Sequence, residues 1–127
     1  MDAQMFWYGA AALAAFFLFR RFWRMRSLKQ YSVPEIDAAL KSRDSLVLLD
    51  VRTDTERQSG AIKGSLHIPL GSLRSRMKEL EQYRKIPIVC YCASGSRSAS
   101  AALLLNQNGF TSGNLRGGMA EWNFAHR

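Results

Sequence analysis

The sequence contains few residues that could form disulfides or bind metal ions. Among its 127 residues are two cysteines and two histidines, and no Cys-x-x-Cys pair occurs. Cys90 and Cys92 are separated only by Tyr91, and a disulfide across so short a span would be strained. We therefore expect no structural disulfide, a reducing environment and no metal site.

The body of the chain also lacks the interleaved basic and aromatic residues that are typical of nucleic-acid binding. Lys and Arg number 18 against 10 Asp and Glu, a net charge of +8. Five of the basic residues are close together near the N-terminus, at Arg20, Arg21, Arg24, Arg26 and Lys29. From Gln30 onward the chain has 13 basic and 9 acidic residues, a net charge of +4. This value is ordinary for a soluble domain, so we expect no nucleic-acid partner.

Charged residues are absent from residues 5–19, which are mostly aromatic or aliphatic. As a helix this stretch would span roughly 22 Å, and continuing it to Trp23 gives roughly 28 Å, close to the ~30 Å of a bilayer core. A cleaved signal peptide would carry its positive charge before the apolar stretch, and an interfacial helix would need a polar face. A buried core helix is the third alternative. The pattern predicts a single-pass membrane anchor over residues 1–23 and a basic juxtamembrane linker over residues 24–29. The basic flank lies on the side of residues 30–127, so the positive-inside rule puts this expected catalytic domain in the cytoplasm.

Short apolar runs alternate with helix-like segments through the remaining residues. Residues 46–49 and 86–91 have the continuous apolar character of buried strands, while 72–83 and 99–106 have helical spacing. This alternation predicts an α/β fold with a mainly parallel central sheet and helices on both faces. Ligands of such folds bind beyond the carboxyl ends of the strands.

Cys92 lies at one of these strand-to-helix turns, where backbone N–H groups and the positive end of the helix dipole converge. That field favours a thiolate. The sequence therefore predicts Cys92 as a nucleophile, with an anion-binding loop formed by Ala93, Ser94, Gly95, Ser96 and Arg97. The alternative is a buried cysteine at a strand end, followed by an ordinary capping serine.

Four segments in this order resemble a single-domain rhodanese, a thiosulfate or persulfide sulfurtransferase. They are residues 48–52, residues 56–65, the Cys92 loop and residues 117–122. The resemblance covers residues 30–124 and implies a rhodanese-like domain in which Asp50 and Arg52 support the pocket. The alternative for these two residues is a surface ion pair with Glu56.

Two positions depart from the pattern of the family that the chain resembles. The family usually has His where Ala61 stands, and many members carry Arg directly after the nucleophile, where this chain has Ala93. The second departure removes a cation from the pocket, which disfavours thiosulfate as a donor.

The activity that the resemblance implies is transfer of sulfane sulfur through a Cys92 persulfide. The donor would be thiosulfate or a persulfide, and the acceptor a small-molecule or protein thiol, or cyanide. This chemistry needs no cofactor. A cysteine-dependent phosphatase or arsenate reductase is one alternative, although the related phosphatases have five residues between Cys and Arg and this chain has four. The other alternative is a non-catalytic, membrane-anchored interaction module.

Overall fold

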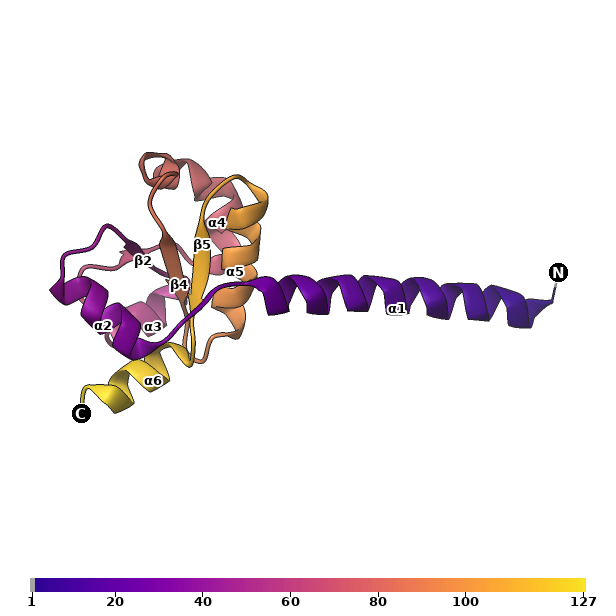
Figure 1. Cartoon of the computed structure of the whole chain (residues 1–127), viewed down its shortest axis with the longest axis horizontal. Coiled ribbons are helices and arrows are strands. Elements are labelled where there is room, and N and C mark those ends of the chain that lie inside the picture. The colour runs from indigo at the N-terminus through magenta and orange to yellow at the C-terminus, as the bar shows by residue number, and fades with distance from the viewer. Residues whose placement is uncertain (1) are drawn as a thin grey trace.

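The computed structural model describes residues 2–127 and consists of one α/β domain with a long N-terminal helix that extends away from it (Figure 1). The strands are β1 (Gln30–Tyr31), β2 (Val47–Asp50), β3 (Leu66–His67), β4 (Ile88–Tyr91) and β5 (Ser112–Leu115). The helices are α1 (Ala3–Ser27), α2 (Val33–Lys41), α3 (Asp54–Gln58), α4 (Leu70–Arg76), the 3₁₀ helix η1 (Met77–Tyr83), α5 (Ser96–Gln107) and α6 (Gly118–Ala125).

All five strands pair in parallel, in the order β1-β5-β4-β2-β3, so β4 is the central strand. The register pairs Leu49 of β2 with Cys90 of β4, and Asp50 with Tyr91. The two strands therefore end side by side, and the residues that follow them meet at one edge of the sheet. The predicted parallel sheet is confirmed.

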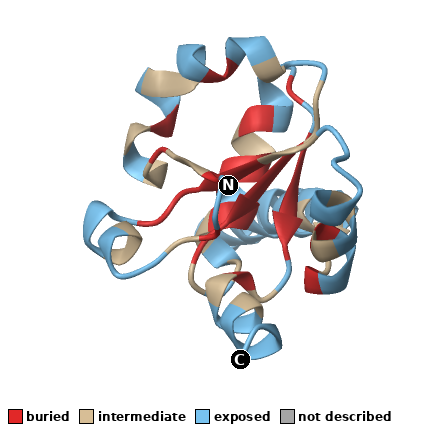
Figure 2. Ribbon diagram, turned by 90° about the vertical axis from the view of Figure 1, so that its left-hand side faces the viewer, coloured by how far each residue is buried: buried red, intermediate tan, exposed pale blue. Residues whose placement is uncertain are grey.

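Side chains that alternate along β4 pack into two separate apolar cores, one on each face of the sheet. Ile88 and Cys90 face the core that α4, η1 and α5 cover, together with Leu49, Leu73 and Leu105. Val89 and Tyr91 face the second core, which includes Val33, Ile36, Ile62 and the partly buried Trp122. The three inner strands β2, β4 and β5 are almost entirely buried, the edge strands β1 and β3 are half-buried, and the outer surfaces of the helices are exposed (Figure 2). Helices thus cover both faces of the sheet, as the alternating pattern predicts.

Two helices that flank the sheet begin at caps visible in the sequence. Ser32 Oγ accepts a hydrogen bond from the backbone N–H of Glu35 at the start of α2. Thr53 and Glu56 form a capping box at the start of α3, where each side chain accepts a hydrogen bond from the other residue's backbone N–H. This box holds the Glu56 carboxylate at the end of β2, near the edge of the sheet where β4 also ends.

The helix predicted over residues 72–83 is divided in the structure. Helix α4 ends at Arg76, whose backbone angles (φ −109°, ψ 11°) are not helical, and η1 continues with the tighter 3₁₀ turn. With this change of pitch, Leu73 and Leu80 are both completely buried in the same core. Burial of both leucines outweighs the regular spacing that predicted one continuous helix.

Helix α1 corrects the prediction made for the N-terminal residues. Within residues 2–127, no helix combines the length and the continuous apolar character that crossing a bilayer requires. The uncharged stretch of α1 stops at Phe19, and the remaining two turns carry Arg20, Arg21, Arg24 and Arg26. Including these guanidinium groups in the span was the error, because each is costly to transfer into hydrocarbon. The predicted single-pass membrane anchor at residues 1–23 is therefore wrong, and so is the membrane localisation with a cytoplasmic catalytic domain.

The same helix also runs through most of the segment expected to be a linker, since it ends only at Ser27. No residue of α1 is buried, although Met25 packs partly against the domain and Leu28, directly after the helix, is buried in the first core. The chain therefore joins the domain at Leu28.

Candidate active site

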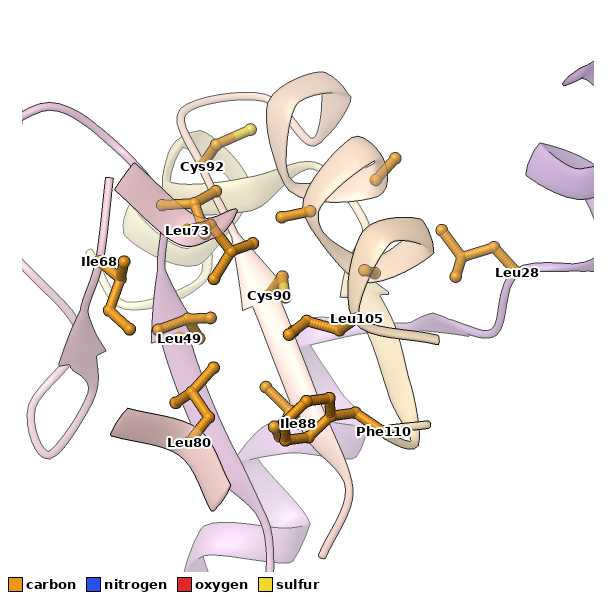
Figure 3. Packing of buried hydrophobic residues seen from close by; sticks show 14 residues of the cluster. Leu28, Leu49, Ile68, Leu73, Leu80, Ile88, Cys90, Cys92, Leu105 and Phe110 are labelled. Carbon is orange, nitrogen blue, oxygen red and sulfur yellow. The ribbon is translucent and has the colours of Figure 1, made fainter. Parts of the chain in front are cut away.

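Cys92 directly follows the central strand and lies below the first turn of α5 (Figure 3). Its residue surface is completely buried, as is that of Cys90 two positions earlier on β4. Both are free thiols. Figure 3 shows Cys90 among Leu49, Ile88 and Leu105 in the middle of the apolar cluster, whereas Cys92 is at the edge of the same cluster, just past the end of the strand.

Hydrogen-bond donors converge on the Cys92 sulfur. The backbone N–H of Gly95 donates to Sγ over 3.0 Å, and the Ser98 hydroxyl lies 3.3 Å from the same atom. Burial by itself would raise the pKa of Cys92, but hydrogen bonds from the Ser98 hydroxyl and from the backbone N–H groups of Ser98, Gly95 and Ser94 outweigh it and lower the pKa below its ordinary value. Cys90 has one such contact, to Ser112 Oγ at 3.5 Å, and burial raises the pKa of its thiol to about 12.

Two glycines allow the loop to curl around the sulfur. Gly95 has a φ of 111°, in the left-handed region that glycine adopts without steric cost, and this conformation directs its N–H at Sγ. Gly118 has a φ of 57°, and a Cβ at this position would collide with the Cys92 carbonyl oxygen. Because Gly118 has no side chain, the first turn of α6 approaches closely, and the N–H groups of Met119 and Ala120 donate to the carbonyls of Cys92 and Ala93 over 2.8 and 3.1 Å.

Arg97 forms a two-pronged ion pair with Glu56 at the rim of the loop. Its Nη1 and Nη2 donate to the two carboxylate oxygens over 2.6 and 2.9 Å. Both side chains are about one-third exposed. The hydrogen bonds from Arg97 lower the pKa of Glu56 to about 2, so this carboxylate stays ionised throughout the physiological range.

Asp50 and Arg52 are buried beside the end of β4 and bind each other. The Asp50 carboxylate accepts hydrogen bonds from the backbone N–H of Arg52 over 2.9 Å and from its Nη2 over 2.8 Å, and Arg57 Nη1 lies 3.3 Å away. Burial alone would raise the pKa of Asp50, but the hydrogen bonds from Arg52 and Arg57 keep it below its ordinary value. Arg52 also donates to the Gly60 carbonyl over 2.6 Å. This buried cluster fixes the loop that follows α3.

That loop in turn holds Tyr91, the residue directly before Cys92. Tyr91 Oη accepts a hydrogen bond from the Ile62 N–H over 3.1 Å and lies 2.9 Å from Ser65 Oγ. Arg57 Nη1 donates to the same Ser65 hydroxyl over 2.7 Å. The buried ion pair therefore connects to strand β4 through the Tyr91 hydroxyl.

The structure brings the predicted loop residues 93–97 around the Cys92 sulfur and puts Asp50 and Arg52 in the layer behind it. It does not pair Glu56 with either of them, because Glu56 binds Arg97 instead. Sequence reasoning missed Ser98, Asn114 and the brace formed by α6. Ser98 could have been noted because it directly follows the loop, whereas nothing local marks Asn114, which is 16 residues further along the chain.

Comparison with known proteins assigns the chain to a family. The sequence matches the family of the Rhodanese-like domain over residues 32–125. The chain belongs to this family, and the resemblance seen in the four sequence segments is confirmed.

Individual relatives agree with the family assignment. The chain is 30% identical over 95 residues to the Bacillus subtilis protein YtwF, covering 75% of this chain and 90% of YtwF. It is 36% identical over 96 residues to a sulfurtransferase of Allochromatium vinosum, covering 71% of this chain and 88% of that protein. Among solved structures, a thiosulfate sulfurtransferase from Pseudomonas aeruginosa superposes with a TM-score of 0.69 at 28% identity, over 80% of this chain and 20% of the other.

The opposite pKa shifts of the two cysteines predict that alkylation will separate them. A thiolate reacts and a thiol does not, so a lowered pKa preserves reactivity as the pH falls. In the Cys90→Ser variant, the rate of iodoacetamide modification of Cys92 should reach its midpoint below ~8.5, the ordinary cysteine value. In the Cys92→Ser variant, the buried Cys90 should remain unmodified up to about pH 9, well below its pKa of about 12. A Cys92 midpoint at or above the ordinary value would contradict the stabilised thiolate.

Proposed function

We propose that this protein is a sulfurtransferase that carries sulfane sulfur as a persulfide on Cys92. The observation that carries the proposal is the convergence of the Gly95 N–H and the Ser98 hydroxyl on a buried sulfur whose pKa is lowered. Membership of the rhodanese-like domain family and the sulfurtransferase of Allochromatium vinosum at 36% identity support it.

In the first half-reaction the Cys92 thiolate attacks the outer sulfur of the donor. With thiosulfate, the new S–S bond forms as the S–S bond of the donor breaks, and sulfite leaves with the bonding electron pair. With a persulfide donor, the leaving group is a thiolate. In both cases the negative charge of the nucleophile ends on the terminal sulfur of the Cys92 persulfide. The backbone N–H groups of the loop are available to stabilise that charge, as in an oxyanion hole.

In the second half-reaction an acceptor thiolate, or cyanide, attacks the terminal sulfur. The S–S bond of the persulfide breaks, Cys92 Sγ leaves as a thiolate, and the product is a new persulfide or thiocyanate. No net oxidation or reduction occurs over the cycle, and no proton has to be moved by a general base. The hydrogen bonds that lower the pKa of Cys92 also make its thiolate a better leaving group in this step.

The Arg97–Glu56 ion pair reduces the attraction of the loop for a doubly charged sulfur donor. Arg97 is the cation nearest the loop, and both of its terminal nitrogens are already bound to Glu56. Its charge is therefore largely balanced, and Ala93 supplies no second cation. A thiosulfate dianion gains little attraction at such a rim, so we propose that a singly charged organic persulfide is the better donor.

The same ion pair argues against a phosphatase. A cysteine-dependent phosphatase needs an acid to protonate the leaving alcohol, and Glu56 is the carboxyl group at the rim of the loop. With a pKa of about 2 it holds no proton to give at neutral pH. The four residues between Cys92 and Arg97 also leave a shorter loop than the five of the related phosphatases.

Mass spectrometry tests the proposed persulfide directly. Cys90 and Cys92 lie in one tryptic peptide, between Lys85 and Arg97, so the Cys90→Ser variant assigns the sulfur to one residue. After incubation with donor, this variant should gain one sulfur atom on that peptide and retain most of its turnover. The Cys92→Ser variant should gain none and lose turnover entirely, because a serine hydroxyl cannot form a persulfide. Equal loss of turnover in both variants would refute a single nucleophile.

Releasing Arg97 from its partner tests the donor preference. Glu56→Gln removes the carboxylate charge, and the amide can still accept the capping hydrogen bond at the start of α3. We expect kcat/KM for thiosulfate to rise about threefold relative to that for an alkyl persulfide, since a solvent-accessible ion pair of this kind contributes roughly 0.2–1 kcal/mol. Glu79→Gln is the matched control, because Glu79 pairs with Arg76 on the surface in the same way. An unchanged ratio in Glu56→Gln would show that the ion pair does not govern the choice of donor.

A further inference from the structure

The hydroxyl of Ser98 faces two hydrogen-bond acceptors with a single proton. Its oxygen is 3.3 Å from Cys92 Sγ and 2.5 Å from Asn114 Oδ1. Ser98 is completely buried and Asn114 nearly so. Bulk water therefore does not compete for the hydrogen bonds of the Ser98 hydroxyl. Because a serine has one O–H donor, it can satisfy the sulfur or the amide oxygen at any moment, but not both.

The orientation of the Asn114 side chain depends on a third residue. Asn114 Nδ2 donates to Gln30 Oε1 over 2.9 Å, so the amide oxygen points at Ser98. Gln30 lies on β1, which pairs with β5 at the register Gln30 to Asn114. If the Gln30 acceptor were lost, the amide could turn and present its NH₂ group to Ser98, which would leave the hydroxyl proton free for the sulfur.

We propose that Asn114 is a positioning residue that competes with Cys92 for the Ser98 proton, and that Gln30 holds it in the competing orientation. The proposal rests on the assigned role of Cys92 as the nucleophile. Ser98 acts directly on the sulfur, whereas Asn114 and Gln30 act only through Ser98.

This competition matches the movement of charge in the sulfur-transfer cycle. In the free enzyme Sγ is a thiolate and a strong acceptor, so the Ser98 hydroxyl points at it. In the persulfide the charge lies on the terminal sulfur and Sγ is a weak acceptor, so the hydroxyl turns to Asn114. When the persulfide is discharged, Sγ leaves as a thiolate and the hydroxyl turns back. The proton remains bonded to the Ser98 oxygen throughout, and only the O–H direction changes.

Other groups around Cys92 are separate from this chain of contacts. Arg97 on α5 is the nearest charge and is bound by Glu56 of α3. Cys90 on β4 is buried and protonated, and Asp50 beside the end of β4 is bound by Arg52. None of these residues hydrogen-bonds to the Ser98 or Asn114 side chain. Substitutions at Asn114 and Gln30 therefore leave these charges in place.

The pH midpoint of Cys92 alkylation by iodoacetamide tests the competition, since removing Ser98 and removing either Asn114 or Gln30 are expected to shift it in opposite directions. All are made in the Cys90→Ser background. Ser98→Ala removes the donor, so the midpoint should rise by about 0.5 to 1 pH unit. Asn114→Leu removes the competing acceptor, so the midpoint should fall. Gln30→Leu should lower it as well, by less.

Opposite shifts for Ser98 and Asn114 variants are a result that loosened packing would not produce. If all three variants raise the midpoint, or if Asn114→Leu and Gln30→Leu leave it unchanged, the competition is refuted. Gln30 is only partly buried, so its variant keeps the test decisive should Asn114→Leu fail to fold. Alkylation needs no sulfur donor, so the result is independent of whether a persulfide forms, and failure of the proposed sulfur transfer would appear separately in the mass of the loaded protein.

Discussion

A negative charge on a buried sulfur must be compensated by nearby hydrogen-bond donors, and several elements of this domain meet around Cys92 to supply them. Burial of Cys92 favours the neutral thiol. The Gly95 N–H and the Ser98 hydroxyl reverse that preference over distances of 3.0 and 3.3 Å. Cys90 is equally buried and has no such donors beyond one long contact to Ser112, and the pKa of its thiol rises to about 12. The two cysteines are separated by one residue, and their environments shift the pKa values of their thiols in opposite directions.

The fold holds these donors in place from four sides. Helix α5 supplies the Ser98 hydroxyl, and α6 binds the carbonyls of Cys92 and Ala93, which is possible only because Gly118 has no side chain. Strand β5 brings Asn114 to the far side of Ser98. On the side of β2, the buried Asp50 fixes the loop that binds the Tyr91 hydroxyl. The backbone N–H of Gly95 is therefore held at the Cys92 sulfur by the fold itself.

Features that depend on neighbouring residues could be predicted from the sequence, whereas features that depend on residues far apart along the chain could not. The strand-to-helix turn at Cys92 is local, and the residue types around it indicate both the turn and its chemistry. Arg97 was expected as part of the anion-binding loop, but its ion pair was not, because its partner Glu56 is 41 residues earlier and reaches it only through the capped start of α3. Asn114 and Gln30 are 84 residues apart and meet because β5 pairs with β1. Strand β1 has only two residues, too few for any periodicity to reveal it. The membrane anchor failed for a different reason, since the apolar run was extended through arginines that end it.

We propose that Cys92 holds a transferable sulfur atom as a discrete persulfide intermediate. To test this, the protein is incubated with a sulfur donor, separated from the donor by gel filtration and mixed with cyanide, while thiocyanate and the protein mass are measured together. We expect one thiocyanate per loaded chain, formed without further donor, as the mass returns to that of the unmodified protein. Retention of no sulfur after gel filtration, or of sulfur that cyanide does not remove, would contradict it.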